Sequence, residues 1–252
     1  MCIRDSLRGV PRIRKIVDDI LCWGETKEEL IETFGEIIKR CSEANITLSK
    51  EKIQVGTQVK FAGFLIGKDG IKPDPEKVEA IRNLKVPENL TDIRGIFGLV
   101  NQFDPFHPDL KHALDPLREL QSIKRSFVWL PEHQVAFEKL KEIICKEDGP
   151  VLALYNAELP VELHTDASRT GLGYALLQTD RTGKTRLICC GSRFLSKAED
   201  NYAVCELEAL AIQYAIQKCD LYLSGRHFDV STDHKPLAVS YTHLTLPTIY
   251  SV

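Results

Sequence analysis

Long apolar runs are missing from this sequence. No stretch approaches about 18 consecutive apolar residues, so no segment is predicted to cross a membrane. The opening stretch, MCIRDSLRGVPRIRK, lacks the apolar centre of a secretory signal. None of the eight cysteines forms a C-x-x-C pair, which argues against a zinc module and indicates reduced thiols in an intracellular compartment.

Neither sign of charge dominates. Lys and Arg total 33 while Asp and Glu total 36, which gives a formal net charge of −3. A nucleic-acid site would therefore be a local basic patch rather than a general field. Of the 252 residues, 43% are apolar and 27% are charged, which excludes wholesale disorder and predicts one large domain or two small ones.

The two ends of the chain differ from its middle. No formally charged side chain follows Lys235, and the opening MCIRDS is equally unlike what comes after it. Both ends resemble translated adapter sequence, so we expect residues 1–6 and 240–252 to be non-native and exclude them from the fold prediction. The alternative is a genuine edge strand, which the following residues suit: Tyr241, Thr245, Ile249 and Tyr250.

The first part of the middle mixes strands and an amphipathic helix. Ile16–Trp23 is predicted to be an apolar hairpin interrupted by Asp18 and Asp19, and Lys27–Ala44 is predicted to be a helix. The strands predicted next are Leu48–Ile53 and Val59–Ile66, followed by a tight turn at Lys68–Gly70.

Helices are predicted for the following stretch. Asp74 is expected to cap one helix and Thr91 the next. Asp104–Ser126, which is rich in Pro, His and charge, predicts a short helix with linkers. Glu132–Cys145 is predicted to be a helix with this buried side: Val135, Phe137, Leu140 and Ile144.

The pattern changes near Gly149–Pro160, where a second part is expected to begin. It has three strand-like runs: Pro160–Ala167, Gly171–Gln178 and Thr185–Phe194. A long helix at Glu199–Cys219 and a fourth strand at His227–Thr232 follow, with Val204 among the residues of the helix's apolar stripe. The order of these elements predicts an α/β (α+β) fold.

Three acidic residues of this second part could converge. Asp166 and Asp233 end strands, and Glu208 lies in the middle of the long helix, beside its apolar stripe. If that helix packs on the sheet, the three carboxylates can meet at one edge, where a pair of Mg²⁺ ions would offset their repulsion. Taken singly, each acid also fits a turn, a cap or a solvated helix position. His164 and His234 flank the acids and could support them or serve in packing.

Three blocks of sequence occur in order between Pro160 and Leu237: TDASRTGLGYALLQ, SRFLSKAEDNYAVCELEALAI and STDHKPL. They resemble the RNase H domain of gypsy-type LTR retrotransposon polyproteins. The resemblance implies an RNase H-like mixed sheet with a packed helix, and it implies that Asp166, Glu208 and Asp233 are catalytic metal ligands. Glu206 is the poorer match for the helical acid, and the family's fourth acid lies further downstream.

The first half resembles the reverse transcriptase of the same polyproteins. Ile-Val-Asp-Asp at 16–19 is similar to the aromatic-x-Asp-Asp turn of the palm, with Ile16 where many relatives have Tyr. FAGFLIGKDGIKPDPEKVEAI resembles the junction of palm and thumb, RGIFGLVNQF the thumb, and FVWLPEHQVAFEKLKEII the connecting segment. The resemblance implies that Asp18 and Asp19 are catalytic metal ligands of the polymerase.

The domains expected from the resemblance are the end of the palm over 7–72, a thumb-like helical region over 73–125, a connection over 126–155, and a C-terminally truncated RNase H-like domain over 156–239. The implied activities are RNA-directed DNA synthesis and cleavage of RNA in RNA–DNA hybrids, with two Mg²⁺ ions for which Mn²⁺ can substitute. The palm's other metal acid and the downstream acid are not found in this sequence, so we expect the chain alone to be incomplete for both activities.

The resemblance also implies partners and a location. The expected partners are an RNA–DNA hybrid, template–primer nucleic acid and other parts of the same polyprotein, with no membrane. The expected location is intracellular, in the cytoplasm or in virus-like particles. Two alternatives stay open: a non-catalytic module that grips duplex nucleic acid, and a fragment of a decayed element that forms no stable protein.

Overall fold

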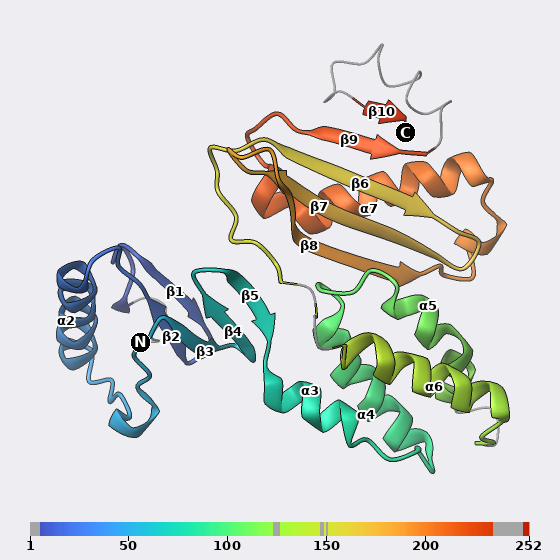
Figure 1. Ribbon diagram of the computed structural model, residues 1–252, viewed down its shortest axis with the longest axis horizontal. Helices are drawn as coiled ribbons and strands as arrows, with labels where there is room; N and C mark the ends of the chain where they lie inside the picture. The colour runs from blue at the N-terminus through green and yellow to red at the C-terminus, as the bar shows by residue number, and fades with distance from the viewer. Residues whose placement is uncertain (1–5, 123–126, 147–148, 150, 234–248, 252) are drawn as a thin grey trace. The chain divides into compact units, whose positions relative to one another are not determined.

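The structure is a computed structural model that describes residues 6–122, 127–146, 149, 151–233 and 249–251. The chain divides into two compact units, residues 1–68 and residues 69–252, each with its own apolar core. Both units combine helices with strands, so the predicted mixed α/β class is confirmed (Figure 1). Among the described helices, none combines the length and apolar character that a bilayer crossing needs.

The first unit contains the predicted hairpin. β1 (Ile13–Ile16) and β2 (Asp19–Cys22) pair antiparallel, with Ile16 opposite Asp19. Val17 takes a positive φ of 52° in the turn between them, which is a strained conformation for a β-branched residue. Asp18 lies in the same turn, so the two adjacent acids stand at the tip of the hairpin.

The predicted amphipathic helix packs against this hairpin. α2 (Lys27–Glu43) begins after Thr26, whose hydroxyl accepts the Glu29 N–H at 3.2 Å. Ile37 and Cys41, one turn apart on α2, are buried in a small core with these residues: Leu7, Val10 and Ile13. The helix prediction is confirmed.

Two strand predictions in the rest of the first unit are wrong. Leu48–Ile53 contains a short 3-10 helix, η1 (Lys50–Lys52), because residues 49–53 are exposed and offer no face to bury. The predicted strand Val59–Ile66 is two strands, β3 (Gln58–Phe61) and β4 (Phe64–Gly67), paired antiparallel. Ala62 and Gly63 form the turn with positive φ values of 52° and 80°, the backbone that a two-residue hairpin requires.

The second unit begins with a short strand and a group of helices. They are β5 (Gly70–Pro73), α3 (Pro75–Arg82), α4 (Leu90–Val100), η2 (Asn101–Phe103), α5 (Leu110–Leu114), η3 (Asp115–Gln121) and α6 (Pro131–Ile144). Asp74 caps α3 as predicted, since its carboxylate accepts the Glu76 N–H at 3.1 Å. The helices share one core, whose buried side chains include Ile81, Ile93, Phe103, Leu117, Phe137 and Leu140.

Two details of the helical prediction are wrong. Thr91 does not cap α4, because Asn89 lies at the cap position and its Oδ1 accepts the N–H groups of Thr91 and Asp92 at 2.9 and 3.0 Å. Val135 is 69% exposed, while its neighbour Ala136 is buried. The other three residues predicted for the buried side of α6 are buried.

A five-stranded sheet forms the remainder of the second unit, in the order β10-β9-β6-β7-β8. Its strands are β6 (Val161–Ala167), β7 (Gly171–Thr179), β8 (Thr185–Phe194), β9 (Asp229–Thr232) and β10 (Ile249–Ser251). β6, β7 and β8 form an antiparallel meander, whereas β9 pairs parallel with β6 and with β10. The four predicted strands are confirmed. Tyr241 and Thr245, considered above for an edge strand, lie outside the described residues.

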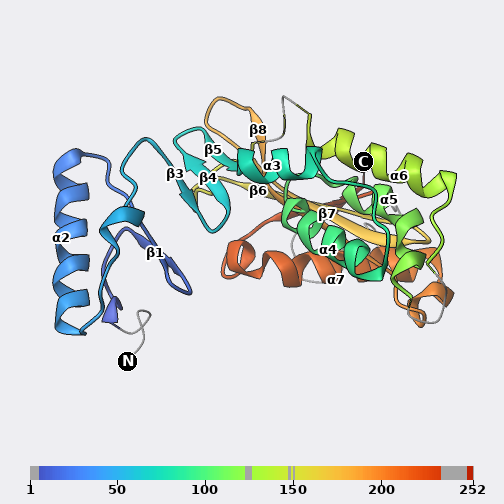
Figure 2. The ribbon, with the colours of Figure 1, turned by 90° about the horizontal axis from the view of Figure 1, so that it is seen from below.

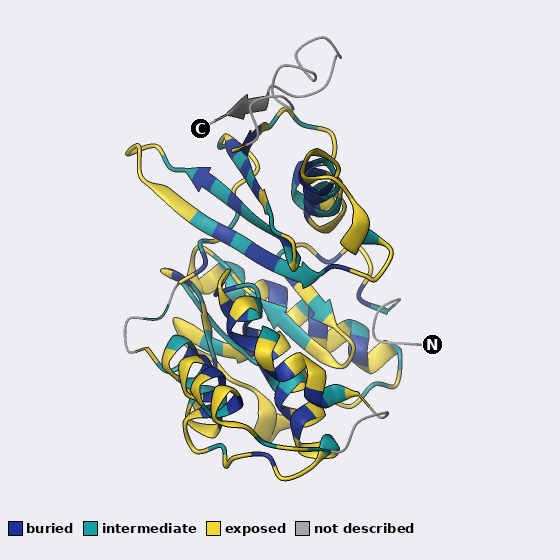
Figure 3. Cartoon of the chain, turned by 90° about the vertical axis from the view of Figure 1, so that its right-hand side faces the viewer, coloured by how far each residue is buried: buried dark blue, intermediate teal, exposed yellow. Residues whose placement is uncertain are grey.

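One long helix covers one face of this sheet (Figures 1 and 2). The predicted helix Glu199–Cys219 is in fact a short turn, η4 (Glu199–Asn201), followed by α7 (Val204–Leu223). Val204 is 50% exposed, because the helix begins there. The buried residues between α7 and the sheet (Figure 3) include Leu163, Leu176, Ala211, Ala215 and Val230.

Polar contacts join the helical part of this unit to the edge strand β8. The Cys190 N–H donates to the Pro105 carbonyl oxygen at 3.1 Å. The Ser192 N–H and hydroxyl each donate to the Asp104 carboxylate at 3.4 Å. Burial raises the pKa of Asp104, although Lys111, whose Nζ lies 3.8 Å away, acts in the opposite direction.

Candidate metal centre

Two of the three predicted acids stand at the ends of neighbouring strands. β6 and β9 run parallel with Thr165 opposite Thr232, and Asp166 and Asp233 come directly after these partners. Parallel strands deliver residues of equal register to the same edge of a sheet. Both aspartates are exposed there, side by side.

Glu208 reaches the same edge from α7. Its residue is 2% exposed, in contrast to the solvated position that is usual for a glutamate in the middle of a helix. Carboxylate oxygens of Asp166, Glu208 and Asp233 all lie within 4.8 Å of one another. The structure therefore brings together the three acids chosen from the sequence, and we refer to them as the acidic corner.

Crowding changes the proton affinity of Glu208. Burial first, and then the charges of Asp233 and Asp166, raise its pKa to about 7. Hydrogen bonds from the Ala167 backbone and the Thr232 side chain act in the opposite direction. The second carboxyl oxygen, Oε2, is buried without a hydrogen-bond partner. A divalent cation with oxygen ligands would supply that partner and offset the repulsion, so the residues present fit such an ion.

A cleft of about 580 Å³ opens beside the acidic corner. Asp166 and Asp233 line it together with Lys111 of α5. Gly173 and Ala175 of β7 also line it, and the missing side chain of the glycine and the single methyl group of the alanine leave room above the sheet. The two aspartates therefore face a space in the size range of ligand-binding clefts.

His164 lines the same cleft, two residues before Asp166 on the same side of β6. Its Nε2 lies 2.9 Å from Glu162 Oε1, and both side chains are nearly half exposed. The alternation predicted for this strand is confirmed, since the opposite side is buried at Val161, Leu163 and Thr165. His234 lies outside the described residues.

Comparison with known proteins adds the family. Residues 129–230 match the family model described as the RNase H-like domain found in reverse transcriptase. The retrovirus-related Pol polyprotein from transposon gypsy of Drosophila melanogaster is 32% identical over 234 residues, or 88% of this chain. The chain belongs to the gypsy-type Pol polyproteins of LTR retrotransposons.

Two further transposon polyproteins are similar to most of this chain. The Pol polyprotein from transposon opus of Drosophila melanogaster is 33% identical over 88% of this chain. The transposon Tf2-3 polyprotein of Schizosaccharomyces pombe is 29% identical over 92% of it. The chain spans 22% of the gypsy polyprotein, 23% of the opus polyprotein and 17% of the Tf2-3 polyprotein.

Solved structures of the foamy viral protease-reverse transcriptase share the fold of this gypsy-type chain. The complex of that protein with an RNA/DNA hybrid has a TM-score of 0.82 and 22% identity, covering 99% of this chain and 37% of that one. A complex with dsDNA has a TM-score of 0.78 and 22% identity, covering 99% and 56%. At this identity the likeness shows the fold alone.

Asp18 and Asp19, the other acids that the gypsy-type resemblance indicated, are both exposed in the first unit. Across the described ranges, no third Asp, Glu, His or Cys groups with them closely enough to share a metal ion. Two carboxylates at a hairpin tip offer few ligands to a cation that prefers six oxygens.

A second group of ligand-type side chains in the gypsy-type chain is occupied by protein contacts. Glu119, Glu132 and His133 also have ligand atoms within 4.8 Å of one another. His133 is 1% exposed, its Nδ1 accepts the Leu130 N–H at 3.0 Å, and its Nε2 lies 3.2 Å from Glu119 Oε1. Both ring nitrogens are therefore used at the start of α6, which supports a structural role for this histidine.

The sequence prediction missed the residues that hold Glu208. Thr232 and the Ala167 backbone hydrogen-bond its carboxyl group, and each adjoins an aspartate of the acidic corner in the sequence. The Thr-Asp and Asp-Ala pairs at the two strand ends were the available signal. Only the packing of α7 on the sheet gives these pairs a role.

Proposed function

We propose that this chain carries the ribonuclease H site of a retroelement reverse transcriptase, which cleaves the RNA strand of an RNA–DNA hybrid. The acidic corner carries the proposal: three carboxyl groups within 4.8 Å of one another, two of them inside the stretch that matches the RNase H-like family model. The choice of a hybrid as substrate is supported by the foamy viral protease-reverse transcriptase, which was solved with an RNA/DNA hybrid.

Asp166, Glu208 and Asp233 are proposed to hold a pair of Mg²⁺ ions, for which Mn²⁺ can substitute. Such ions, when bound, lower the pKa of a water molecule and stabilise the leaving oxygen of a phosphodiester. Asp166 and Asp233, exposed at the cleft, direct the ligand set toward the substrate. Glu208, with its pKa raised to about 7, would have to be deprotonated to hold such an ion, so metal affinity would rise with pH.

The cleft is proposed to hold the nucleic-acid backbone beside the acidic corner. Its lining includes polar groups of the kinds that contact phosphate and sugar: Lys111, His112, His164, Ser168, Thr170 and Arg193. Lys111 lies 3.8 Å from Asp104, and Arg193 lies 2.8 Å from Glu199. Because these cations are paired, they add directed donors more than net positive charge, in keeping with the net charge of −3.

The proposal extends to the rest of the chain. Asp18 and Asp19 are proposed as this chain's share of the Mg²⁺ site for RNA-directed DNA synthesis on a template–primer, completed by other parts of the polyprotein. The proposed domains are the palm over 7–72, the thumb-like region over 73–125, the connection over 126–155 and the RNase H-like domain over 156–239. The proposed location is the cytoplasm or virus-like particles.

Manganese binding to the purified chain, followed by electron paramagnetic resonance, tests the metal site. We expect Asp166→Asn and Glu208→Gln to weaken Mn²⁺ binding at least about tenfold, because each removes a ligand charge. Glu206→Gln is the matched control, since Glu206 is exposed on the same helix and its carboxylate accepts the Ala203 N–H at 2.8 Å. Equal Mn²⁺ affinity in the wild type and Asp166→Asn would contradict the proposed site.

A hybrid with a labelled RNA strand tests the chemistry. Because we expect the chain alone to be incomplete, the assay uses the chain extended by the downstream part of its polyprotein. We expect RNA cleavage that depends on Mg²⁺, is lost in Asp233→Asn and is retained in Glu206→Gln. Salt-sensitive binding of the hybrid by the wild type, with no cleavage in Mg²⁺ or Mn²⁺, would instead favour the non-catalytic module.

A further inference from the structure

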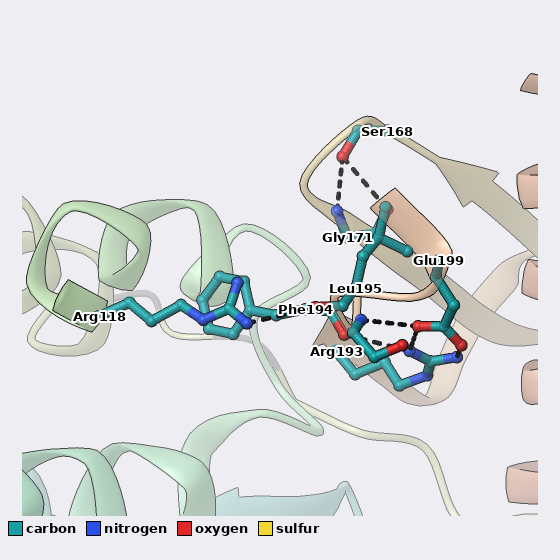
Figure 4. Close-up of polar contacts among 8 residues, drawn as sticks. Arg118, Ser168, Gly171, Arg193, Phe194, Leu195 and Glu199 are labelled. Carbon is teal, nitrogen blue, oxygen red and sulfur yellow. Dashed lines mark hydrogen bonds and ion pairs between the residues drawn. The ribbon is translucent and has the colours of Figure 1, made fainter. Parts of the chain in front are cut away.

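Arg118 of η3 reaches from the helical part of the second unit to the end of β8. Its Nη2 donates to the Leu195 carbonyl oxygen at 3.2 Å. Its guanidinium carbon lies 4.5 Å from the centre of the Phe194 ring (Figure 4). One side chain therefore holds two consecutive residues of the strand end.

Those two residues pack into different cores. Phe194 lies against the helical core built from α3 to α6. Leu195 is 2% exposed and is buried with Leu172, Leu207 and Ala211, between the sheet and α7. Arg118 therefore contacts the strand end at the place where the helical core and the core between the sheet and α7 meet.

Leu195 contacts the turn after Asp166 and the helix that carries Glu208, and so connects to two of the three acids of the acidic corner. Its N–H donates to the Thr170 carbonyl oxygen at 3.1 Å, in the turn that follows Asp166. Its side chain shares a buried cluster with Leu207, the residue before Glu208 on α7. A displacement of Leu195 would thus reach both acids through contacts of a single residue.

Hydrogen bonds within the turn after Asp166 order it, and the Leu195 N–H adds one more from outside the turn. The Ser168 hydroxyl accepts the Gly171 N–H at 3.0 Å (Figure 4), and the Ser168 N–H donates to the Gly171 carbonyl oxygen at 2.8 Å. Gly171 fits because a Cβ there would lie 2.8 Å from the Arg193 carbonyl oxygen. The turn and the end of β8 are therefore in close backbone contact.

The same strand end is also fixed from the α7 side. Arg193 forms a two-pronged ion pair with Glu199, with both N–O distances 2.8 Å, and its guanidinium carbon lies 5.2 Å from the Tyr214 ring centre (Figure 4 shows the ion pair). The Ser196 N–H donates to Glu199 at 2.7 Å. Arg118 adds a hydrogen bond to Leu195 and a cation–π contact with Phe194 from the helical part.

We propose that Arg118 is a positioning residue for the acidic corner: through Leu195 it orders the turn after Asp166 and the segment of α7 that carries Glu208. This inference rests on the proposed function. Metal ligands must be placed within about 0.5 Å of their working positions. Loss of the Arg118 contact, although it lies two contacts away from the acids, is therefore expected to lower the metal affinity. Removal of partners that directly orient ligands costs 10- to 100-fold in metal affinity, and we expect about 3- to 10-fold here.

The test compares Arg118→Met with Lys141→Met in the full chain. Lys141 makes the same kinds of contact inside the helical core: its Nζ donates to the Leu84 carbonyl oxygen at 2.6 Å and lies 4.9 Å from the Phe137 ring centre. Two quantities are measured: hydrogen exchange of the amides at 168–171 and Leu195, and the Mn²⁺ affinity. The Asp104 and Pro105 contacts with β8 remain in both variants.

We expect Arg118→Met to speed exchange at Leu195 and in the turn and to weaken Mn²⁺ binding. Arg118→Lys is expected to restore part of both, and Lys141→Met to change neither. Unchanged exchange in Arg118→Met, or faster exchange with unchanged Mn²⁺ affinity, would overturn the inference. If the wild type binds no Mn²⁺, the proposed metal site falls, and the exchange data alone decide whether Arg118 orders the turn beside Asp166.

Discussion

Asp166 and Asp233 occupy equivalent places in neighbouring parallel strands, since each follows one of the register partners Thr165 and Thr232. Oxygens of both lie within 4.8 Å of the Glu208 carboxylate. The parallel pairing of β6 with β9, together with the packing of α7 on the sheet, brings these like charges close. The metal-free folded state therefore carries an electrostatic cost that a bound proton or a bound cation offsets.

Glu208→Gln is expected to stabilise the metal-free protein at pH 8. The folded-state pKa of Glu208, about 7, lies above its ordinary value of 4.5, so the wild type loses stability as the pH rises from 4.5 to 7. Glutamine mimics the protonated acid and escapes that loss, which amounts to about 1–3 kcal/mol. Urea unfolding in a chelating buffer at pH 4 and pH 8 measures the difference, which should be near zero at pH 4.

Asp220→Asn serves as the control for that experiment. Asp220 is exposed on the same helix, so its replacement should leave the pH dependence as it is in the wild type. A Glu208→Gln protein that is less stable than the wild type at pH 8 would show that the repulsion is already relieved without metal.

Glu199→Gln should show the opposite pH dependence. Hydrogen bonds from Arg193 and Ser196 lower the pKa of Glu199 to about 2, so its stabilising effect is present above pH 4.5 and is lost as the pH falls through 2. The Glu199 side chain is 15% exposed, and we expect the substitution to cost about 1–2 kcal/mol at pH 7 and almost nothing near pH 2. Glu158→Gln, in an ion pair with Arg181 whose side chains are 76% and 80% exposed, should cost less than about 0.5 kcal/mol at pH 7.

Gly70→Ala is expected to be far more destabilising than Gly183→Ala. Both glycines have positive φ, 129° and 81°, so both substitutions incur the backbone penalty of about 1 kcal/mol. At Gly183 a Cβ meets nothing within 4 Å, whereas at Gly70 it would overlap the Leu152 carbonyl oxygen. That oxygen accepts the Ile71 N–H at 2.8 Å and cannot withdraw freely. Thermal melts of the two variants should differ by at least about 2 kcal/mol, and equal melts would contradict the close approach.

Asn89→Ala is expected to destabilise the helical core by about 1 kcal/mol, because its Oδ1 accepts two N–H groups at the start of α4. Thr91→Ala is the matched control, since Thr91 is an exposed residue of the first turn and should cost less than about 0.5 kcal/mol. Chemical denaturation separates the two. A larger loss for Thr91→Ala would restore Thr91 as the cap.

Periodicity predicted the elements that have a clear buried face. α2, β6, β7, β8 and β9 were found because alternation or helical spacing records which side is buried. The errors fall where burial is weak or a backbone feature decides. Leu48–Ile53 has strand-like composition but exposed residues, and the turn at Ala62 and Gly63 divides an apolar run that looks continuous.

The sequence could name Asp166, Glu208 and Asp233 but could not give their surroundings. The burial of Glu208 depends on where α7 lies against the ends of β6 and β9, which is set by contacts between residues far apart in the chain. Arg118 carried no recognisable pattern, because its partners are the Leu195 backbone carbonyl and the Phe194 ring at the end of β8, both far away in the sequence. Interactions between residues so far apart in the chain produce no periodic pattern in the sequence.

The parallel pairing of β6 with β9 also affects when the molecule assembles. β6, β7 and β8 follow one another in the chain and can form their hairpins early, whereas β9 joins β6 only after α7 has been made and has crossed the sheet. On a ribosome, Asp233 emerges after the whole of that meander and after α7. The mutual repulsion of the three carboxyl groups is therefore met when β9 docks beside β6, and a divalent ion held by the three acids would stabilise that step.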